Sequence, residues 1–253
     1  MLNMAVDAAD QEDDFQGTNI PLPNDKLRLS NHKKDANNLA VLLETGSFNP
    51  PTFMHQQMFA AGREALEMRG FFVVGCYMSP VNNAYGKQGL VPGEHRIRMC
   101  QLVAKDIPLL MVDPWEALQP TYQRTLKVLK RVKNALYGLC SHHCPIRVML
   151  LCGADLLESF TTPGTWIPEQ VEEICRDYGV VCIKRGDKDL KTLIGTSDIL
   201  SKYSENIIIA DKFESDISST RVRENIAKKL PIDELTLPSV IDYIKSNGLY
   251  ETC

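Results

Sequence analysis

Two short segments of this sequence combine turn formers with side chains that can bind phosphate. In the first, Gly46-Ser47-Phe48-Asn49-Pro50-Pro51 is followed by Thr52 and, three residues later, by His55. The two prolines forbid helix before Thr52, and apolar residues recur at helical spacing after it. A helix N-terminus attracts anions through its free N–H groups and its dipole. The segment therefore predicts a phosphate site. Gly46 would let the phosphate approach the backbone closely, and His55 would donate a hydrogen bond to it.

The second segment, residues 216–223, reads Asp-Ile-Ser-Ser-Thr-Arg-Val-Arg and opens a predicted helix that runs to Leu230. Ser218 or Ser219 can cap this helix, and Thr220 and Arg223 can hold phosphate oxygens beside its first-turn N–H groups. Alone, the segment fits a capped helix with surface arginines. Paired with the first segment, it favours phosphate binding by Ser218, Thr220, Arg221, Val222 and Arg223.

Strands and helices alternate through the chain from residue 39 onward. Short apolar runs predict strands at 39–43, 70–78, 109–112, 146–152, 179–185 and 206–210, with helices at 52–65, 92–104, 122–139, 169–178, 218–230 and 238–247. This order predicts an α/β fold, a Rossmann-like doubly wound parallel sheet with helices on both faces. Residues 39–253 form the predicted domain, and the polar residues 1–38 are expected to be a flexible tail.

Several further candidates follow predicted strands, where loops line the ligand crevice of such sheets. Lys87 lies in the loop 82–90 and can neutralise phosphate, although an isolated lysine is more often solvated. Trp115 can stack on a base or serve equally well as a core aromatic. Gly153 permits close backbone approach, and Asp155 can accept from ribose hydroxyls while capping a helix. Trp166 follows a Pro/Gly loop, which suits ring stacking.

Composition excludes several classes of protein. The 253 residues are 44% hydrophobic with a net charge of -4, which supports one sizeable core and does not favour nucleic acid. No apolar run reaches the length of a membrane span. The acidic N-terminus argues against a secretory signal or mitochondrial presequence, and the scattered cysteines suggest reduced thiols. We therefore expect a cytoplasmic and/or nuclear protein.

Known catalytic and metal-binding patterns are otherwise missing from the sequence. There is no G-x-G-x-x-G, no G-x-x-x-x-G-K-[ST] and no nucleophile elbow, so dehydrogenases, P-loop ATPases and serine hydrolases are disfavoured. Cys140, His142, His143 and Cys144 form one cluster, but no second pair stands at zinc-finger spacing. A polar surface loop is favoured over a metal site there.

The two phosphate segments resemble the two signatures of the nucleotidyltransferase superfamily. Gly46-Ser47-Phe48-Asn49-Pro50 with Thr52 and His55 is similar to G-x-F-x-P-x-[HT]-x-G-H, and residues 217–223 match I-S-S-T-x-x-R. Met54 in place of the usual glycine, together with residues 150–160, resembles the nicotinamide-nucleotide adenylyltransferases of animals. The chain departs from them in carrying Lys87-Gln88 where two lysines are common, and in a short 137–145 segment where a long linker is often inserted.

The resemblance implies transfer of the AMP moiety of ATP to nicotinamide or nicotinic acid mononucleotide (NMN or NaMN), forming NAD or deamido-NAD and pyrophosphate. It implies catalytic roles for His55, Thr220 and Arg223. The implied ATP contacts are Gly46, Ser47, Phe48, Thr52, His55, Ser218, Thr220, Arg221, Val222 and Arg223. The implied mononucleotide contacts are Gly46, Ser47, Lys87, Trp115, Tyr122, Thr125, Gly153, Asp155, Thr165, Trp166 and Arg185. Mg²⁺ is expected to be bound mainly through the ATP phosphates.

Two alternatives stay open at this stage. One is another adenylyl- or cytidylyltransferase of the superfamily, such as one that acts on pantetheine phosphate, against which the segments of Trp115 and Trp166 argue. The other is a chaperone-like role in addition to catalysis, as reported for some animal members. The resemblance leaves a homo-oligomer open and implies neither nucleic acid nor a membrane as a partner.

Overall fold

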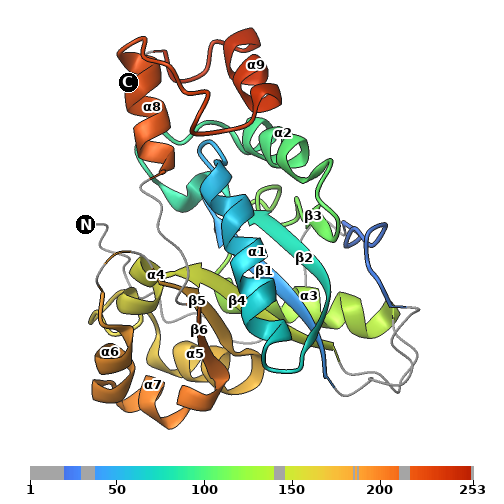
Figure 1. The fold of residues 1–253 in the computed structure, drawn as a ribbon, viewed down its shortest axis with the longest axis vertical. Coiled ribbons are helices and arrows are strands. Elements are labelled where there is room, and N and C mark those ends of the chain that lie inside the picture. Colours follow the sequence, from blue (N-terminus) through green and yellow to red (C-terminus); the bar gives the residue numbers. More distant parts are fainter. Residues whose placement is uncertain are drawn as a thin grey trace.

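The fold is organised around one six-stranded parallel sheet (Figure 1). The computed structural model describes residues 20–29, 38–139, 146–184, 186, 188–210 and 217–251. The strands lie in the order β3-β2-β1-β4-β5-β6, and every neighbouring pair is parallel. They are β1 (Leu39–Gly46), β2 (Phe72–Pro80), β3 (Leu110–Val112), β4 (Ile146–Gly153), β5 (Val180–Ile183) and β6 (Ile207–Ala210).

Helices cover both faces of this sheet. The helices are α1 (Phe53–Glu67), α2 (Gly93–Ala104), α3 (Thr125–Leu139), α4 (Ala154–Ser159), α5 (Pro168–Glu173), α6 (Leu190–Thr196), α7 (Asp198–Lys202), α8 (Ser219–Ala227) and α9 (Pro238–Ser246). Short helical turns are η2 (Asn83–Tyr85), η3 (Ile174–Tyr178) and η4 (Ser204–Asn206). Residues of α1 and α2 pack on one face and residues of α3 to α7 on the other, which confirms the predicted doubly wound α/β fold.

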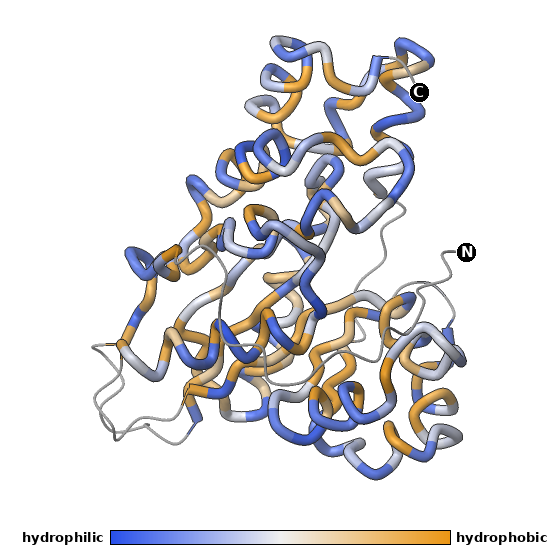
Figure 2. The backbone as a smooth tube through the Cα atoms, turned by 180° about the vertical axis from the view of Figure 1, so that it is seen from behind, coloured by the Kyte–Doolittle hydropathy of each residue, from blue (hydrophilic) through white to orange (hydrophobic). Residues whose placement is uncertain are grey.

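The strands are apolar on both sides because both sides are covered. In β1, Leu39 and Val41 belong to one buried cluster and Ala40 and Leu42 to the other. This is the near-continuous hydrophobic pattern expected of a parallel strand buried between helices. Figure 2 shows the hydrophobic segments running through the central strands, with hydrophilic stretches on the outer helices.

The order of strands places the functional edge of the sheet. After β1 the chain crosses to β2 on one side, whereas β4 lies on the other side, so the strand order reverses between β1 and β4. In such sheets ligands bind outside the carboxyl ends of the strands at this reversal. The turn that follows β1 and the α4 segment that follows β4 therefore flank the expected crevice. At one end of the molecule, α9 lies beside α2 (Figure 1).

The N-terminal segment differs from the expectation of a flexible tail over residues 1–38. Residues 20–29 pack on the domain, and Leu22 is buried in the cluster that also contains Leu39. The Tyr77 hydroxyl donates to the Pro23 carbonyl over 2.7 Å, and the Arg28 N–H donates to Val74. The apolar residues of this segment lack any period, so the tail prediction failed there. The remaining residues of the predicted tail, 1–19 and 30–37, lie outside the described residues.

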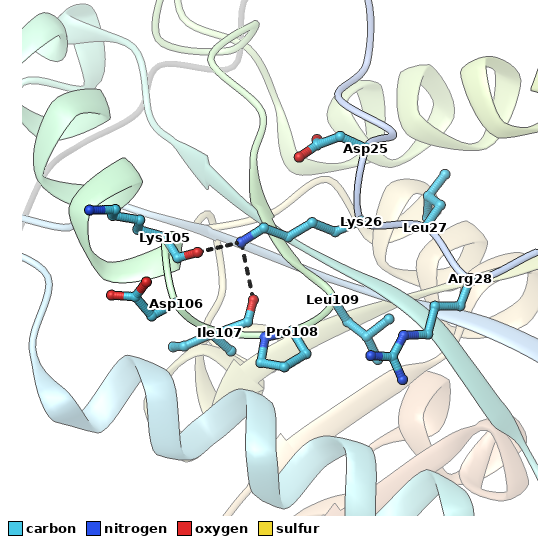
Figure 3. Close-up of a pocket in the computed structure, with 9 residues that line it drawn as sticks. All are labelled: Asp25, Lys26, Leu27, Arg28, Lys105, Asp106, Ile107, Pro108 and Leu109. Carbon is cyan, nitrogen blue, oxygen red and sulfur yellow. Dashed lines mark hydrogen bonds between the residues drawn. The ribbon is translucent and has the colours of Figure 1, made fainter.

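The same segment closes the C-terminal end of α2 (Figure 3). Lys26 Nζ donates to the carbonyls of Ala104, Lys105 and Ile107. A hollow of about 420 Å³ lies between the two segments. It opens at the amino end of β3, opposite the strand ends that carry the turn, so we do not assign it to nucleotide binding.

Among the described residues, no helix is long and apolar enough to cross a membrane. The predicted cluster of Cys140, His142, His143 and Cys144 lies outside the described residues.

Candidate active site

The turn 46–52 connects β1 to α1 in a compact shape. Phe48 adopts φ 42°, in the left-handed region, and its ring is buried under the turn. A Cβ on Gly46 would lie 3.3 Å from that ring, so a glycine fits here because the ring folds back against the backbone.

Other elements bind five of the carbonyls of this turn. The Gly46 carbonyl accepts from the Val81 N–H, and the Ser47 carbonyl accepts from Arg96 Nη1. Three further donors come from the C-terminal part of the chain: Arg223 Nη1 to Asn49, Ser219 Oγ to Pro50 and Thr236 Oγ1 to Pro51, each over 2.8 Å. With its carbonyls engaged in this way, the turn is held rigidly from three sides.

His55 is oriented as a hydrogen-bond donor toward the crevice. Its Nδ1 accepts from the Thr52 N–H over 3.0 Å and lies 2.9 Å from Thr52 Oγ1. A neutral imidazole that accepts at Nδ1 carries its proton on Nε2. Burial lowers the pKa of His55 to about 4, and the positive charge of Lys87 contributes to the shift. The ring also packs against Phe48, with 5.1 Å between centroids.

The first turn of α1 differs from the predicted anion site in one respect. The Thr52 N–H is bound by His55 Nδ1, and the Phe53 N–H is bound by the Leu235 carbonyl. These amides are therefore not available to phosphate. The sequence could not reveal this, because the carbonyl that reaches this helix end comes from a distant residue. The capping contact instead fixes the His55 side chain.

Two cationic side chains come from distant segments to the same turn. Lys87 Nζ lies 3.4 Å from Ser47 Oγ, and Arg223 Nη2 lies 3.3 Å from Thr220 Oγ1 while its Nη1 holds Asn49. Burial lowers the pKa of Lys87, and the charge of Arg223 adds to that shift. The two cations are thus close enough to repel one another. A bound anion would relieve that repulsion.

Ser218 caps α8 and so supports Thr220 and Arg223, as predicted. Its Oγ accepts from the Arg221 N–H over 3.2 Å. Val222, also among the predicted phosphate contacts, has its side chain fully buried in a small cluster with Ile232 and Ile241. Its side chain packs α8 against the C-terminal segment, so only its backbone can serve a ligand.

An aromatic pair stands beside the ends of β2 and β3. Tyr122, a predicted site residue, stacks on Tyr85 with 5.9 Å between centroids. Burial raises the pKa of Tyr122 to about 12, so the phenol keeps its proton. Below the pair, the buried carboxyl of Glu116 accepts from Ser79 Oγ over 2.8 Å, and burial raises the pKa of Glu116 to about 8.

Two predicted mononucleotide contacts are buried in the core. Trp115 is buried, with Arg131 5.3 Å over its ring. Arg131 also pairs with the buried Asp113, which fixes this arrangement. In the described structure Trp115 therefore packs in the core, which is one of the two roles predicted for it. Thr125 begins α3 and is likewise buried.

The segment after β4 holds the remaining predicted residues. Gly153 ends β4, and a Cβ there would meet open space. Asp155 is exposed and accepts from Lys188 Nζ over 2.5 Å. Trp166 is half-buried, donates to Ser159 Oγ over 3.0 Å and packs edge-on against Phe160. Thr165 is exposed beside it, and Arg185 lies outside the described residues.

Sequence reasoning missed three buried polar residues around the turn. Arg96 is fully buried and donates to the carbonyls of Ser47, Val81 and Val91. Asn49 is also fully buried, and Glu44 carries an oxygen, Oε2, with no hydrogen-bond partner among the described residues. Arg96 lies on an amphipathic helix where a surface position was the natural assumption, so no local signal could have found it.

Comparison with known proteins agrees with this geometry. The Cytidylyltransferase-like family matches residues 43–225. A nicotinamide/nicotinic acid mononucleotide adenylyltransferase of Oryza sativa subsp. japonica is 50% identical over 236 residues, covering 92% of this chain and 94% of the relative. Its counterpart from Arabidopsis thaliana is 49% identical, covering 91% and 98%. The Bos taurus relative numbered 1 is 33% identical, covering 84% and 89%. Because the Oryza and Arabidopsis relatives are more similar to this chain than this animal relative is, the resemblance is not specific to animals.

A solved structure supports the fold independently. The Plasmodium falciparum nicotinic acid mononucleotide adenylyltransferase complexed with NaAD superposes with a TM-score of 0.60 at 17% identity, covering 85% of this chain and 98% of that one. At such low identity the likeness establishes the fold alone. On the strength of the sequence relatives, the chain belongs to the nicotinamide/nicotinic acid mononucleotide adenylyltransferases of the cytidylyltransferase-like family.

Proposed function

We propose that this protein transfers the AMP moiety of MgATP to nicotinamide mononucleotide or nicotinic acid mononucleotide. The products are NAD or deamido-NAD and pyrophosphate. The observation that carries the proposal is the convergence of His55, Lys87 and Arg223 on the turn that follows β1, at the reversal point of the sheet. Family membership supports the choice of substrates.

The reaction requires no general base from the protein. An oxygen of the mononucleotide 5′-phosphate, already an anion, attacks the α-phosphorus of ATP. The bond from that phosphorus to the α,β-bridging oxygen breaks, and pyrophosphate leaves with the electron pair. Catalysis of such a transfer consists mainly of positioning and charge neutralisation.

Each cationic or donor group has a defined part in this scheme. The Nε2–H of His55 would donate to the α- and β-phosphates as charge moves toward the leaving group. Thr220 and Arg223 would hold the β- and γ-phosphates, and Lys87 would neutralise phosphate from the facing loop. The half-buried Trp166 and the pair of Tyr85 and Tyr122 would offer aromatic rings on which a pyridine nucleotide could stack.

Magnesium would enter as part of the ATP substrate. Among the described residues, no three His, Cys, Asp or Glu side chains gather into a group that could hold a metal ion. Since Mg²⁺ binds readily through substrate phosphates and keeps several waters, this donor set fits a metal carried on ATP. There the ion would neutralise charge on the departing pyrophosphate.

Steady-state formation of NAD from MgATP and NMN tests the proposal. His55→Ala should lower kcat/KM at least a hundredfold, about 2.7 kcal/mol of transition-state stabilisation. The matched control is His95→Ala, because His95 contacts Tyr243 rather than the turn, and its activity should stay near wild type. A folded wild-type protein that forms neither NAD from NMN nor deamido-NAD from NaMN would refute the substrate assignment. Pantetheine phosphate would then be assayed next.

A further inference from the structure

The C-terminal end of the described chain reaches back to the turn 46–52. The Tyr250 hydroxyl donates to Asn49 Oδ1 over 2.9 Å, although the two residues are 201 positions apart in the sequence. Tyr250 is only 6% exposed and Asn49 is fully buried. The hydrogen bond is therefore shielded from water. Because water cannot replace the lost partner, removing the hydroxyl takes one partner from a buried polar atom.

The backbone at Tyr250 is held in an unfavourable conformation. Its φ is 66°, in the left-handed region that bulky residues rarely adopt. Helix α9 ends just before it, where the Leu249 N–H donates to the Ile244 carbonyl. A conformation of this kind persists only when surrounding contacts fix it, commonly at functional sites.

Asn49 links three segments that carry site residues. Its Oδ1 also accepts from the Val91 N–H over 3.2 Å, and its Nδ2 donates to the Gly89 carbonyl over 2.8 Å. These contacts fix one end of the loop that bears Lys87. The Asn49 carbonyl accepts from Arg223. The orientation of the Asn49 side chain thus sets how the turn and the Lys87 loop lie relative to one another, while the Asn49 backbone ties Arg223 to the same turn.

We propose that Tyr250 is a positioning residue for phosphate binding in this enzyme. Its hydroxyl fixes the orientation of the Asn49 amide and thereby the spacing between the turn and the loop that bears Lys87. Tyr250 does not touch the substrate. Its effect extends to both substrates, since the turn and Arg223 carry ATP-phosphate candidates and the loop carries Lys87, a mononucleotide candidate.

The inference rests on the proposed function, so its test includes a measurement that is independent of the mononucleotide. Tyr250→Phe removes one hydroxyl and keeps the ring. Calorimetry should show pyrophosphate binding about fivefold more weakly, the loss expected for one neutral hydrogen bond. KM for MgATP and KM for NMN should both rise by a similar factor.

Tyr243→Phe is the matched control, because Tyr243 contacts His95 from α9 and does not reach the turn. Its pyrophosphate affinity and KM values should match wild type. A double-mutant cycle with Asn49→Ala supplies the second variant: Tyr250→Phe should have no further effect on pyrophosphate affinity in that background.

Three results would overturn the positioning role. They are wild-type affinity and KM in Tyr250→Phe, a lower melting temperature with unchanged KM, and full additivity with Asn49→Ala. A wild type that binds pyrophosphate but forms no NAD or deamido-NAD would refute the proposed function alone, and the binding comparison would still judge Tyr250.

Discussion

At the scale of single residues, the site is built from groups whose charge states are set by burial. His55 has its pKa lowered to about 4 in the folded protein, below its ordinary value of 6.5. The neutral ring is therefore the form that meets the substrate at neutral pH, and a phosphate bound beside it would raise that pKa again.

A pH titration of the free enzyme checks this state of His55. Because the folded-state pKa is depressed, the contribution of His55 to stability is fully present above pH 6.5 and is lost as pH falls toward about 4. The proton resonances of its ring should show no titration between pH 8 and 5.5, and should titrate at higher pH when pyrophosphate is bound. A midpoint near 6.5 in the free enzyme would contradict the buried neutral form.

Glu44 gives a second prediction at this scale. Burial raises its pKa well above the ordinary value, and its Oε2 lacks a hydrogen-bond partner among the described residues. A raised pKa means that folding favours the protonated acid, so stability falls as pH rises above the ordinary pKa of about 4.5. Glu44→Gln should therefore raise the free energy of unfolding at pH 8 by about 1 kcal/mol or more relative to its effect at pH 5.

Urea unfolding at the two pH values measures this difference. Glu67→Gln serves as the control, because Glu67 is an exposed glutamate paired with Arg63 on the surface of α1. Its effect should be small and nearly independent of pH. The same small effect at Glu44 would show that this carboxylate ionises without cost.

At the scale of elements, the sequence predicted the strands of the sheet well but did not predict the N-terminal segment 20–29 that packs against it. The strands carry continuous apolar runs that need no tertiary information, and Pro50 and Pro51 mark the start of α1 unambiguously. The segment 20–29 has no period, yet it packs because Leu22 and Leu27 fit against the sheet: a Cβ on Gly75 would lie 2.4 Å from Leu27. Such a segment packs because its side chains are complementary in shape to the surface of the domain, and that complementarity cannot be read from the sequence of the segment alone.

The contact between Lys26 and the end of α2 tests what this segment contributes. Lys26→Met removes an ammonium that satisfies three carbonyls at the C-terminus of the helix. It should lower the free energy of unfolding by about 1 kcal/mol and leave kcat near wild type, since the active site is at the opposite edge of the sheet. Lys105→Met, at an exposed lysine of the same hollow, should change neither quantity. A loss of activity at unchanged stability would link the segment to catalysis instead.

The residues of the active site were predictable to the extent that the two signatures carry them. His55, Thr220 and Arg223 meet around the turn as the signatures imply, and Lys87, predicted from its place after a strand, joins them there. The burial of Trp115 could not be read from the sequence, because whether a side chain at a strand end faces the crevice or the core depends on its neighbours, here Asp113 and Arg131. Arg96, Asn49 and Tyr250 act through buried contacts between distant segments, which a single sequence does not display.

At the scale of the whole molecule, a protein of net negative charge holds two cationic side chains, Lys87 and Arg223, close enough at the turn 46–52 to repel one another. Lys87 is partly desolvated beside Arg223, so the free enzyme is less stable than it could be, and an anion should stabilise the entire fold. Lys87→Met should raise the melting temperature of the free protein and reduce the further rise that pyrophosphate produces. For wild type, pyrophosphate at a hundred times its Kd should add about 2.7 kcal/mol.

Thermal unfolding over a pyrophosphate series separates the two effects. The control is Lys191→Met, an exposed lysine on α6, which should match wild type with and without the anion. If Lys87→Met lowers the melting temperature of the free protein, or leaves the stabilisation by pyrophosphate intact, then Lys87 is a structural or solvated residue. The expected opposite signs would instead show that stability is given up at this position for anion binding, a trade that a purely structural lysine would not produce.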